Sequence, residues 1–247
     1  MTEEGAPVLS VVVPAFNEAS RIAGSLERIA GYLMSVPYDA ELIVVDDGSD
    51  EAGRRAAEDA IAVLRPGLTR HLLRHESNRG KGAAVRSGCL AARGRYVAFL
   101  DADLATPPEA LGGLIEALEA GADVAVGVRN QADGTDMRSR RSLVRRLAGK
   151  AFAGAVALLL LPGIEDSQCP LKAFRSDAAK RLFALQRIES WAFDAELLYL
   201  ARRLGMKTAQ VPVAWSAVEG SHLRLTRAAG ELLNLLRIRW VHRRVKA

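Results

Sequence analysis

The chain has 247 residues, of which 49% are hydrophobic and 26% are charged, and this composition indicates an ordinary globular protein with a sizeable core. The formal net charge is +5, and the excess of positive residues is unevenly distributed along the chain. The two cysteines, Cys89 and Cys169, lack CxxC or metal-ligand spacing, which argues against a disulfide framework and indicates the reduced thiols of a cytosolic protein.

We do not expect the chain to span a membrane. Residues 1–7 lack the basic and apolar regions of a signal peptide. The longest apolar run, residues 151–161, is too short to cross a bilayer. The sequence therefore predicts a soluble or membrane-surface protein.

Short apolar runs alternate with helical patterns through the first half of the chain. Strands are expected over residues 9–14, 41–45, 95–100 and 123–128, with a weaker one over 69–74. Helices are expected over residues 20–33, 50–62, 83–92 and 108–120, the second capped by Ser49 or Asp50. This alternation predicts an α/β fold with a mostly parallel central sheet flanked by helices.

Three of the predicted strands run directly into polar turns: Asn17-Glu18, Asp46-Asp47 and Asp101-Ala-Asp103. Such strand ends meet at one edge of a parallel sheet, so they indicate one cleft lined by carboxylates. Two adjacent carboxylates are hard to keep ionised without a cation, which favours a divalent metal at Asp101 and Asp103. The alternative is an acidic turn that caps the next helix. Glycine-rich dinucleotide and Walker motifs are absent, which disfavours those two classes.

The second half contains a basic stretch, a polar stretch and three further elements. Residues 136–150 are rich in arginine and precede the apolar run, which suits a helix at a membrane interface, although a solvated helix face is the alternative. Residues 165–175 are expected to form an irregular active-site loop. Helices are expected over residues 176–185 and from residue 191, the latter with Asp194 in its first turn, and Pro212 marks a last edge strand.

The tail, residues 223–247, is expected to form a basic amphipathic helix. Its predicted apolar face contains Leu225, Ala229, Leu232, Leu233, Leu236 and Trp240. Such a helix suits an anionic membrane surface, and it equally suits packing on the core. The two interpretations are compatible if each face of the helix has one of these roles.

Seven motifs together resemble a known family. Val13-Pro14-Ala-Phe-Asn17-Glu18, Val45-Asp46-Asp47-Gly48-Ser49, Asn78-Arg-Gly-Lys81-Gly82 and Asp101-Ala-Asp103 resemble inverting glycosyltransferases of family 2, which have the GT-A fold. The second half resembles their dolichyl- and polyprenyl-phosphate glucosyltransferase branch, through Asp166-Ser-Gln-Cys-Pro-Leu-Lys172, Trp191-Ala-Phe-Asp194-Ala-Glu196-Leu and Val211-Pro-Val-Ala-Trp215. The resemblance implies a GT-A catalytic domain over residues 1–220 and a membrane-surface helix over residues 221–247.

The resemblance also implies roles on the donor side. The nucleotide would be held by Asp101 and by Pro14, Asn17, Glu18, Asp46, Asp47 and Lys81. Asp47 would accept a hydrogen bond from the uracil edge, while Asp101 and Asp103 would hold Mg²⁺ or Mn²⁺ on the diphosphate. Position 105 is alanine where mannosyl-transferring relatives have glutamine, so a further metal ligand would come from water, phosphate or elsewhere.

On the acceptor side, a lipid phosphate is already anionic and needs no strong base. A sugar hydroxyl would need one, and Asp166 or Asp194 would then supply it. The cations expected to hold the acceptor phosphate are Arg129, Arg138, Lys172 and Arg224. The relatives usually have lysine where this chain has His222, which places more weight on Arg224.

The predicted function is transfer of a hexose, glucose or N-acetylhexosamine, from a UDP-sugar to polyprenyl or dolichyl phosphate. The enzyme would work peripherally on the cytoplasmic face of a membrane, where a small transmembrane partner protein could assist it, and it would not bind nucleic acid. The alternatives are a family 2 enzyme with a soluble sugar or polysaccharide acceptor, and a nucleotide-sugar-binding protein without catalysis. The sequence does not distinguish glucose, N-acetylgalactosamine and mannose, and it does not indicate the oligomeric state.

Overall fold

The structure is a computed structural model that describes residues 6–129, 154, 156, 160–216 and 228–246, and only the backbone of residues 228–232. The predictions for residues 136–150, for most of residues 151–161, and for Arg138, His222 and Arg224 lie outside the described residues.

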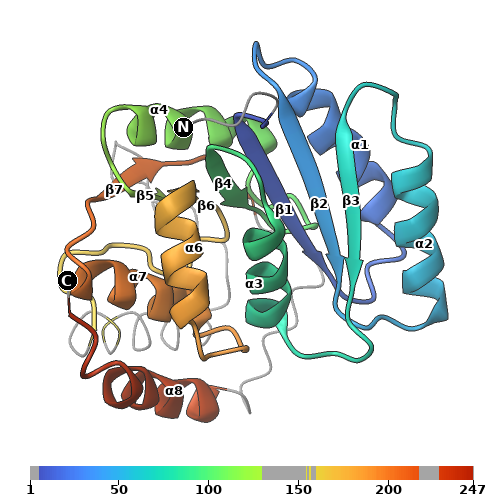
Figure 1. Cartoon of the computed structure of the whole chain (residues 1–247). Helices are drawn as coiled ribbons and strands as arrows, with labels where there is room; N and C mark the ends of the chain where they lie inside the picture. Colours follow the sequence, from blue (N-terminus) through green and yellow to red (C-terminus); the bar gives the residue numbers. More distant parts are fainter. Residues whose placement is uncertain (1–5, 130–153, 155, 157–159, 217–227, 247) are drawn as a thin grey trace.

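The described strands form one sheet of seven, in the order β3-β2-β1-β4-β6-β5-β7 (Figure 1). Their bounds are β1 Leu9–Ala15, β2 Ala40–Asp46, β3 Thr69–Arg74, β4 Tyr96–Phe99, β5 Val124–Val128, β6 Lys172–Arg175 and β7 Thr208–Pro212. β1 to β4 are mutually parallel, β5 and β7 pair in parallel, and β6 runs antiparallel to both of its neighbours. The prediction of a mostly parallel sheet is confirmed, and Pro212 lies on an edge strand as expected.

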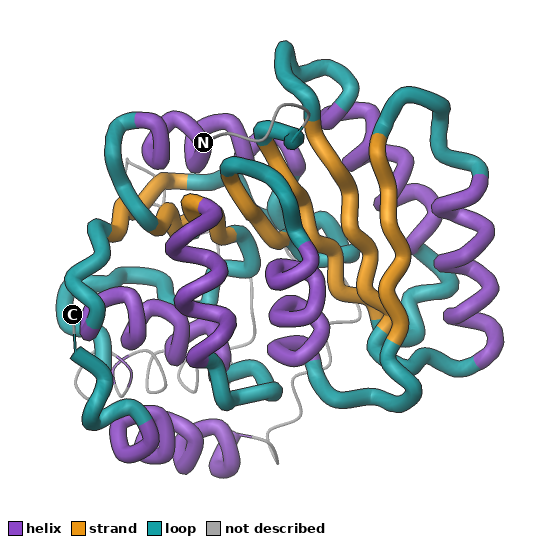
Figure 2. Tube along the Cα trace, in the orientation of Figure 1, coloured by secondary structure: helices purple, strands orange, loops and turns teal. Residues whose placement is uncertain are grey.

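Helices cover both faces of this sheet (Figure 2). Their bounds are α1 Ile22–Leu33, α2 Glu51–Ala62, α3 Lys81–Ala91, α4 Leu111–Glu119, α6 Ser176–Leu185, α7 Phe193–Arg203 and α8 Ala228–Val241, with a short 3₁₀ turn, η1 Pro108–Ala110, before α4. Successive strand residues point to opposite faces, so Val12 packs in the core on the α3 and α6 side, while Val11 and Val13 pack on the α1 and α4 side. β1 therefore lies between two cores and holds its carboxyl end in a fixed position.

One expected loop contains a strand. Residues 165–175 were expected to be irregular throughout, but Lys172–Arg175 forms β6, between β4 and β5. The strand is only four residues long and begins with a lysine, which makes it look like a polar loop in the sequence. Lys172 is nevertheless fully buried, because its ammonium group is paired with a carboxylate inside the protein.

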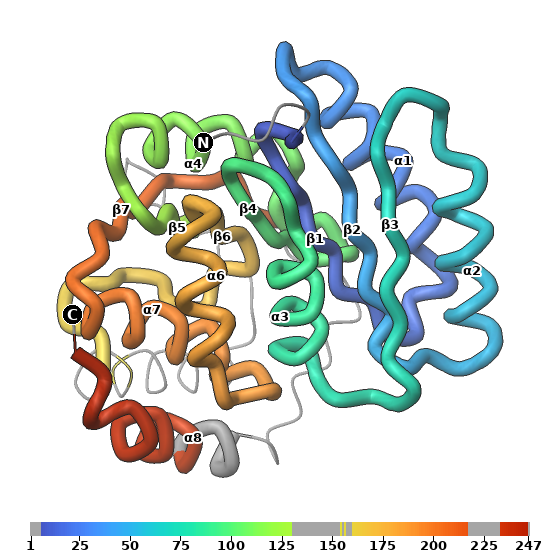
Figure 3. The backbone as a smooth tube through the Cα atoms, in the orientation of Figure 1, coloured from blue at the N-terminus to red at the C-terminus, as the bar shows by residue number. Residues whose placement is uncertain are grey.

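The C-terminal helix α8 lies along the lower side of the molecule, beneath α7 (Figure 3). Leu235 and Ile238 are fully buried against the core, whereas Leu233, Leu236 and Trp240 are 67%, 53% and 66% exposed. The helix thus has one apolar row facing inward and a second facing solvent. Leu233, Leu236 and Trp240 of the predicted apolar face form the exposed row, whereas the residues that pack on the core, Leu235 and Ile238, were not part of that predicted face. The membrane-surface role of the helix stays a prediction. In the described parts of the chain, no helix is both long enough and apolar enough to span a membrane.

Candidate active site

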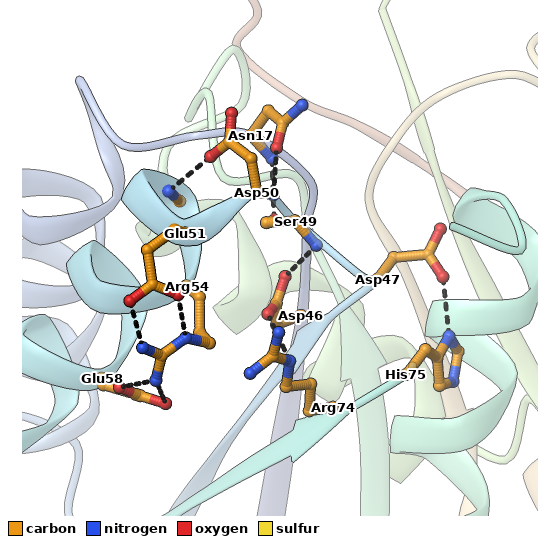
Figure 4. A network of polar contacts seen from close by, with 11 residues as sticks. Asn17, Asp46, Asp47, Ser49, Asp50, Glu51, Arg54, Glu58, Arg74 and His75 are labelled. Carbon is orange, nitrogen blue, oxygen red and sulfur yellow. Dashed lines mark hydrogen bonds and ion pairs between the residues drawn. The ribbon is translucent and has the colours of Figure 1, made fainter. Parts of the chain in front are cut away.

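The turns that follow β1 and β2 are joined by Asn17. Its backbone has a φ of 55°, a left-handed conformation that asparagine tolerates better than most residues. Its backbone N–H donates to Ser49 Oγ at 2.9 Å, and its side-chain oxygen accepts from the backbone N–H of Asp50 at 2.9 Å. Asp50 in turn caps α2 by accepting from the N–H of Gly53 at 2.8 Å, as expected, and Figure 4 shows these residues together. The two strand ends are therefore one rigid unit.

Asp46 is buried at the end of β2 and supports the same turn. Its Oδ1 accepts from the backbone N–H of Ser49 at 3.0 Å, and its Oδ2 lies 3.5 Å from Arg74 Nε at the end of β3 (Figure 4). Pro14 lies in β1, and Glu18 pairs with Arg21 at 2.7 Å. The predicted nucleotide-binding residues thus gather at the carboxyl ends of adjacent strands.

Asp47 holds the loop that begins α3. Its Oδ1 accepts from His75 Nδ1 at 2.6 Å and from the backbone N–H of Arg79 at 3.1 Å. Its Oδ2 accepts from Asn78 Nδ2 at 3.0 Å and from the backbone N–H of Gly80 at 2.7 Å. The sequence suggested that Asp47 accepts from a uracil edge, but these four bonds use the capacity of the carboxylate. In the structure Asp47 shapes the Asn78–Gly80 loop instead.

Lys81 begins α3 and lies between carboxylates and aromatic rings. Its Nζ is 2.6 Å from Asp101 Oδ1, 5.0 Å from the centre of the Trp191 ring and 6.0 Å from that of Phe193. Burial acts to lower the pKa of Lys81, but the attraction of Asp101, followed by that of Asp194, outweighs it and raises the pKa. Lys81 is therefore a fixed positive charge at the end of β4.

Asp103 is the second carboxylate at this point. Its Oδ1 accepts from the backbone N–H of Ala105 at 3.0 Å, in a turn where Leu104 has a left-handed φ of 51°. Burial raises the pKa of Asp103, and the negative charge of Asp101 raises it further.

Two partly buried carboxylates that repel each other suit a divalent cation. Mg²⁺ is typically bound by one or two carboxylates together with phosphate and water. Among the described residues no group of three or more His, Cys, Asp or Glu side chains is placed to hold a metal.

Asp194 and Lys172 form a buried ion pair beside the site. Lys172 Nζ lies 2.5 Å from Asp194 Oδ1 and 2.7 Å from the carbonyl oxygen of Cys169. Burial raises the pKa of Asp194, while Lys172 and then Lys81 oppose that rise. Lys172 was expected to hold an acceptor phosphate, but its side chain is completely enclosed and neutralises Asp194. The structure thus gives it a different contact from the one expected.

Arg129 and Asp166, expected to bind phosphate and to act as a base respectively, face each other. Arg129 Nε and Nη2 donate to the two oxygens of Asp166, both at 2.6 Å, and the Arg129 backbone N–H donates at 3.1 Å. Burial acts to lower the pKa of Arg129, and Asp166 raises it above its usual value. This bidentate pair joins the residue that follows β5 to the stretch before β6.

A cavity of about 510 Å³ opens beside Lys81, between the α3 loop, residues 187–191 and α8. It is lined by Asn78, Arg79, Gly80, Lys81, Arg187, Ile188, Glu189, Ser190, Trp191, Asn234 and Arg237. Sequence reasoning did not place Arg187, Asn234 or Arg237 at the site. The motif around Trp191 was the one sequence feature that could have pointed to these three residues, because Trp191 lines the same cavity.

The family assignment follows from comparison with known proteins. The model for "Glycosyl transferase family 2" matches residues 10–183 of the chain. The chain belongs to glycosyl transferase family 2. The resemblance inferred from the sequence motifs is therefore confirmed, and the protein is a glycosyltransferase.

This family 2 glycosyltransferase is similar to proteins named dolichyl-phosphate beta-glucosyltransferase. It is 35% identical over 226 residues to the one from Dictyostelium discoideum, covering 87% of this chain and 68% of the relative. It is 34% identical over 231 residues to the Homo sapiens protein, covering 87% and 69%, respectively. It is 31% identical over 235 residues to the Saccharomyces cerevisiae protein, covering 88% and 69%.

Solved structures of glucosyl-3-phosphoglycerate synthase from Mycobacterium tuberculosis share the fold of this glycosyltransferase. The complex with Mn²⁺, uridine diphosphate and glucosyl-3-phosphoglycerate has a TM-score of 0.68 at 21% identity, covering 99% of this chain and 81% of that one. The complex with Mg²⁺ and uridine diphosphate has the same TM-score, identity and coverage. The likeness confirms the expected GT-A fold.

Proposed function

We propose that this glycosyltransferase transfers glucose from UDP-glucose to a polyprenyl or dolichyl phosphate at a membrane surface. The observation that carries the proposal is the arrangement at the end of β4. There Lys81, paired with Asp101, lines a cavity whose rim carries exposed arginines. The names of the relatives, which cover most of the chain, support the choice of sugar and of acceptor.

The donor would lie across the carboxyl ends of β1, β2 and β4. Asn17 and Asp46 keep the first two turns in place, while Pro14 lies near the end of β1 and Glu18 follows that strand. Asp47 contributes indirectly, by holding the loop that leads to Lys81. We propose that Asp101 and Asp103 hold Mg²⁺ or Mn²⁺, which when bound would stabilise negative charge on the leaving diphosphate. Lys81 adds a second positive charge at the same place.

The acceptor phosphate would enter the cavity from the side of α8. Arg187 and Arg237 are exposed on its rim, and they form no ion pair with any described residue. Lys172 and Arg129, in contrast, are enclosed with Asp194 and Asp166 as partners. We therefore propose Arg187 and Arg237 as the phosphate-holding cations, with Arg138 and Arg224 kept as additional candidates from the sequence.

No strong base is required for this reaction. A phosphate monoester has a second pKa of about 6, so its oxygen is already anionic near neutral pH. Asp194 and Asp166 are each tied to a cation, which suits a role in positioning the site better than proton abstraction. An acceptor with a free hydroxyl group would instead need one of these carboxylates released from its partner.

The direct test is a transfer assay with a panel of nucleotide sugars, polyprenyl phosphate as the sole acceptor, and Mg²⁺ or EDTA. We expect glucose to be transferred from UDP-glucose with Mg²⁺ and no transfer with EDTA. Transfer only to soluble sugars would favour the alternative family 2 enzyme. Binding of UDP-glucose without metal-dependent release of UDP from any acceptor would favour a non-catalytic binding protein. The cytoplasmic face and a small transmembrane partner remain part of the proposal, to be tested by co-purification from membranes.

A further inference from the structure

A second cavity, of about 710 Å³, lies at the C-terminal ends of α7 and α8. Its described lining residues are Leu160, Pro162, Tyr199, Arg202, Arg203, Arg239, Arg243 and Lys246. None of these residues lines the cavity beside Lys81. The donor and acceptor roles proposed above therefore leave this cavity without a function.

The lining of the second cavity is strongly basic. Five of its eight described side chains are arginine or lysine, and none is acidic. Arg202 donates to the carbonyl oxygen of Leu160 at 3.3 Å, Arg203 to that of Val245 at 2.9 Å, and Arg243 to that of Trp240 at 2.8 Å. Bonds to neutral carbonyl oxygens orient these guanidinium groups without cancelling their charge.

The negative ends of the two helix dipoles offset only part of this positive charge. Cations near the C-terminal end of a helix stabilise the helix, because that end carries about half a negative elementary charge. Two helix ends together offset only about one positive charge. Arg202, Arg203 and Arg243 bond to neutral carbonyl oxygens and keep their charge, which favours an anionic ligand in the cavity.

The solvent-facing apolar row of α8 lies next to this cavity. Leu233, Leu236 and Trp240 follow the spacing i, i+3 and i+7, which places them on one side of a helix. The guanidinium carbon of Arg243 lies 4.7 Å from the centre of the Trp240 ring, so one residue borders both the row and the cavity. The neighbouring features suit a molecule with an anionic head and an apolar body.

We propose that the cavity between α7 and α8 binds the phosphate-bearing headgroup of an anionic phospholipid while Leu233, Leu236 and Trp240 insert among the acyl chains. This site rests on the proposed function in one respect, namely that a lipid acceptor brings the protein to a bilayer. The phospholipid is a docking ligand and is not consumed. The positive lining matches the charge of the headgroup, and the apolar row matches the region beneath it.

The position of α8 would connect docking to the reaction. Asn234 and Arg237 line the cavity beside Lys81, while Arg239 and Arg243 line the headgroup cavity, and the apolar row lies on the same helix. A helix held in the bilayer interface by this row would therefore keep the mouth of the active-site cavity close to the membrane surface.

The test compares the neighbouring variants Arg243→Gln and Arg244→Gln in the full chain. Both remove one positive charge from the same segment, but only Arg243 lines the headgroup cavity. Sedimentation with phosphatidylcholine vesicles, with and without phosphatidylserine, measures binding. We expect Arg244→Gln to lose at most about fivefold in binding to the anionic vesicles, the effect of one basic residue near an anionic surface. Arg243→Gln should lose more than this, because it also removes a cation from the lining of the cavity.

Several outcomes would overturn the headgroup site. Equal losses in the two variants would indicate attraction of a basic tail without a defined cavity. Binding of inorganic phosphate that Arg243→Gln abolishes, together with no vesicle binding, would identify a site for a free anion. Glucose transfer to polyprenyl phosphate in detergent is measured on the same proteins. Its persistence without vesicle binding would remove the headgroup site alone, and its absence alongside normal vesicle binding would remove the proposed function alone.

Discussion

His242 Nε2 lies 2.6 Å from Glu196 Oε1, and both side chains are buried. The same carboxylate accepts from the backbone N–H groups of Arg187 at 2.9 Å and Ile188 at 2.8 Å. One buried group on α7 therefore joins the C-terminal segment to the loop that lines the active-site cavity. We therefore expect a displacement of α8 also to displace Arg187 and Ile188, on the proposed acceptor side of the cavity, through this contact.

Replacement of His242 by alanine should destabilise the protein. Glu196 would keep its buried charge and lose one partner, which costs about 1–3 kcal/mol of the free energy of unfolding. Urea unfolding followed by circular dichroism measures the change. Arg244→Ala is the control, since Arg244 lies two residues further on and is exposed, and its replacement should change the free energy of unfolding by less than about 0.5 kcal/mol. If His242→Ala leaves the free energy of unfolding unchanged, the contact between His242 and Glu196 does not stabilise the protein.

Asp103→Asn should separate activity from stability. Loss of one metal-holding carboxylate is expected to lower the transfer rate about 100-fold, since metal assistance contributes several kcal/mol to such a transition state. The metal-free protein should not be destabilised, because the substitution removes a negative charge that Asp101 repels. The assay and a thermal unfolding curve without metal provide both measurements. A variant as active as the unchanged protein would remove Asp103 from the metal site.

Gly80→Ala should disrupt the loop before α3, because a Cβ atom there would lie 2.5 Å from the carbonyl oxygen of Glu189. Gly67 is a matched control: its φ is +104° against +108° for Gly80, and a Cβ atom would meet no described atom within 4 Å. Gly67→Ala should therefore cost only about 1–2 kcal/mol for the left-handed backbone. Gly80→Ala should cost more and weaken UDP binding in calorimetry. Equal effects of the two variants would show that the close approach to Glu189 is unimportant.

The Lys172–Asp194 pair should behave as one buried unit. Lys172→Met alone leaves the Asp194 charge without its partner, and breaking such a pair costs about 3–5 kcal/mol. The double variant Lys172→Met and Asp194→Leu should recover part of this loss, because neither charge then remains buried. Chemical unfolding of the single and double variants gives the coupling energy. Fully additive losses would mean that the two side chains do not interact.

The two thiols should resist modification in the folded protein. Burial and then the charge of Asp166 raise the pKa of Cys169 to about 11, and burial raises the pKa of Cys89 well above its usual value. Raised pKa values keep both groups neutral, so a disulfide reagent near pH 8 should react only after unfolding. By linkage, their contribution to stability is present below the unfolded value of about 8.5 and is lost as pH rises towards 11. Rapid labelling of either thiol in the native protein would contradict this.

The sequence predicted the strands and the polar turns that follow them because both depend on neighbouring residues. The apolar run before Asp101, for example, indicates a buried strand by its composition alone, and the acidic residues after it mark the cleft edge. Asp50 could be placed as a helix cap for the same reason, since its partner is three residues away.

Contacts between distant residues could not be predicted in this way. Asp47 is bound by residues 28 to 33 positions further on, which the local pattern around it does not reveal. Lys172 was predicted to be a phosphate-binding cation because its partner, Asp194, is 22 residues away and the local pattern does not reveal it. Arg187 and Arg237 meet at one cavity only through the packing of α8.

The Arg129–Asp166 pair fastens together the two ends of the segment that connects β5 to the stretch before β6. Because the pair holds these two ends together through two hydrogen bonds of 2.6 Å, a change of sequence between them is expected to leave β5 and β6 in place. Variation in this part of the chain is thereby uncoupled from the donor side proposed at β1, β2 and β4.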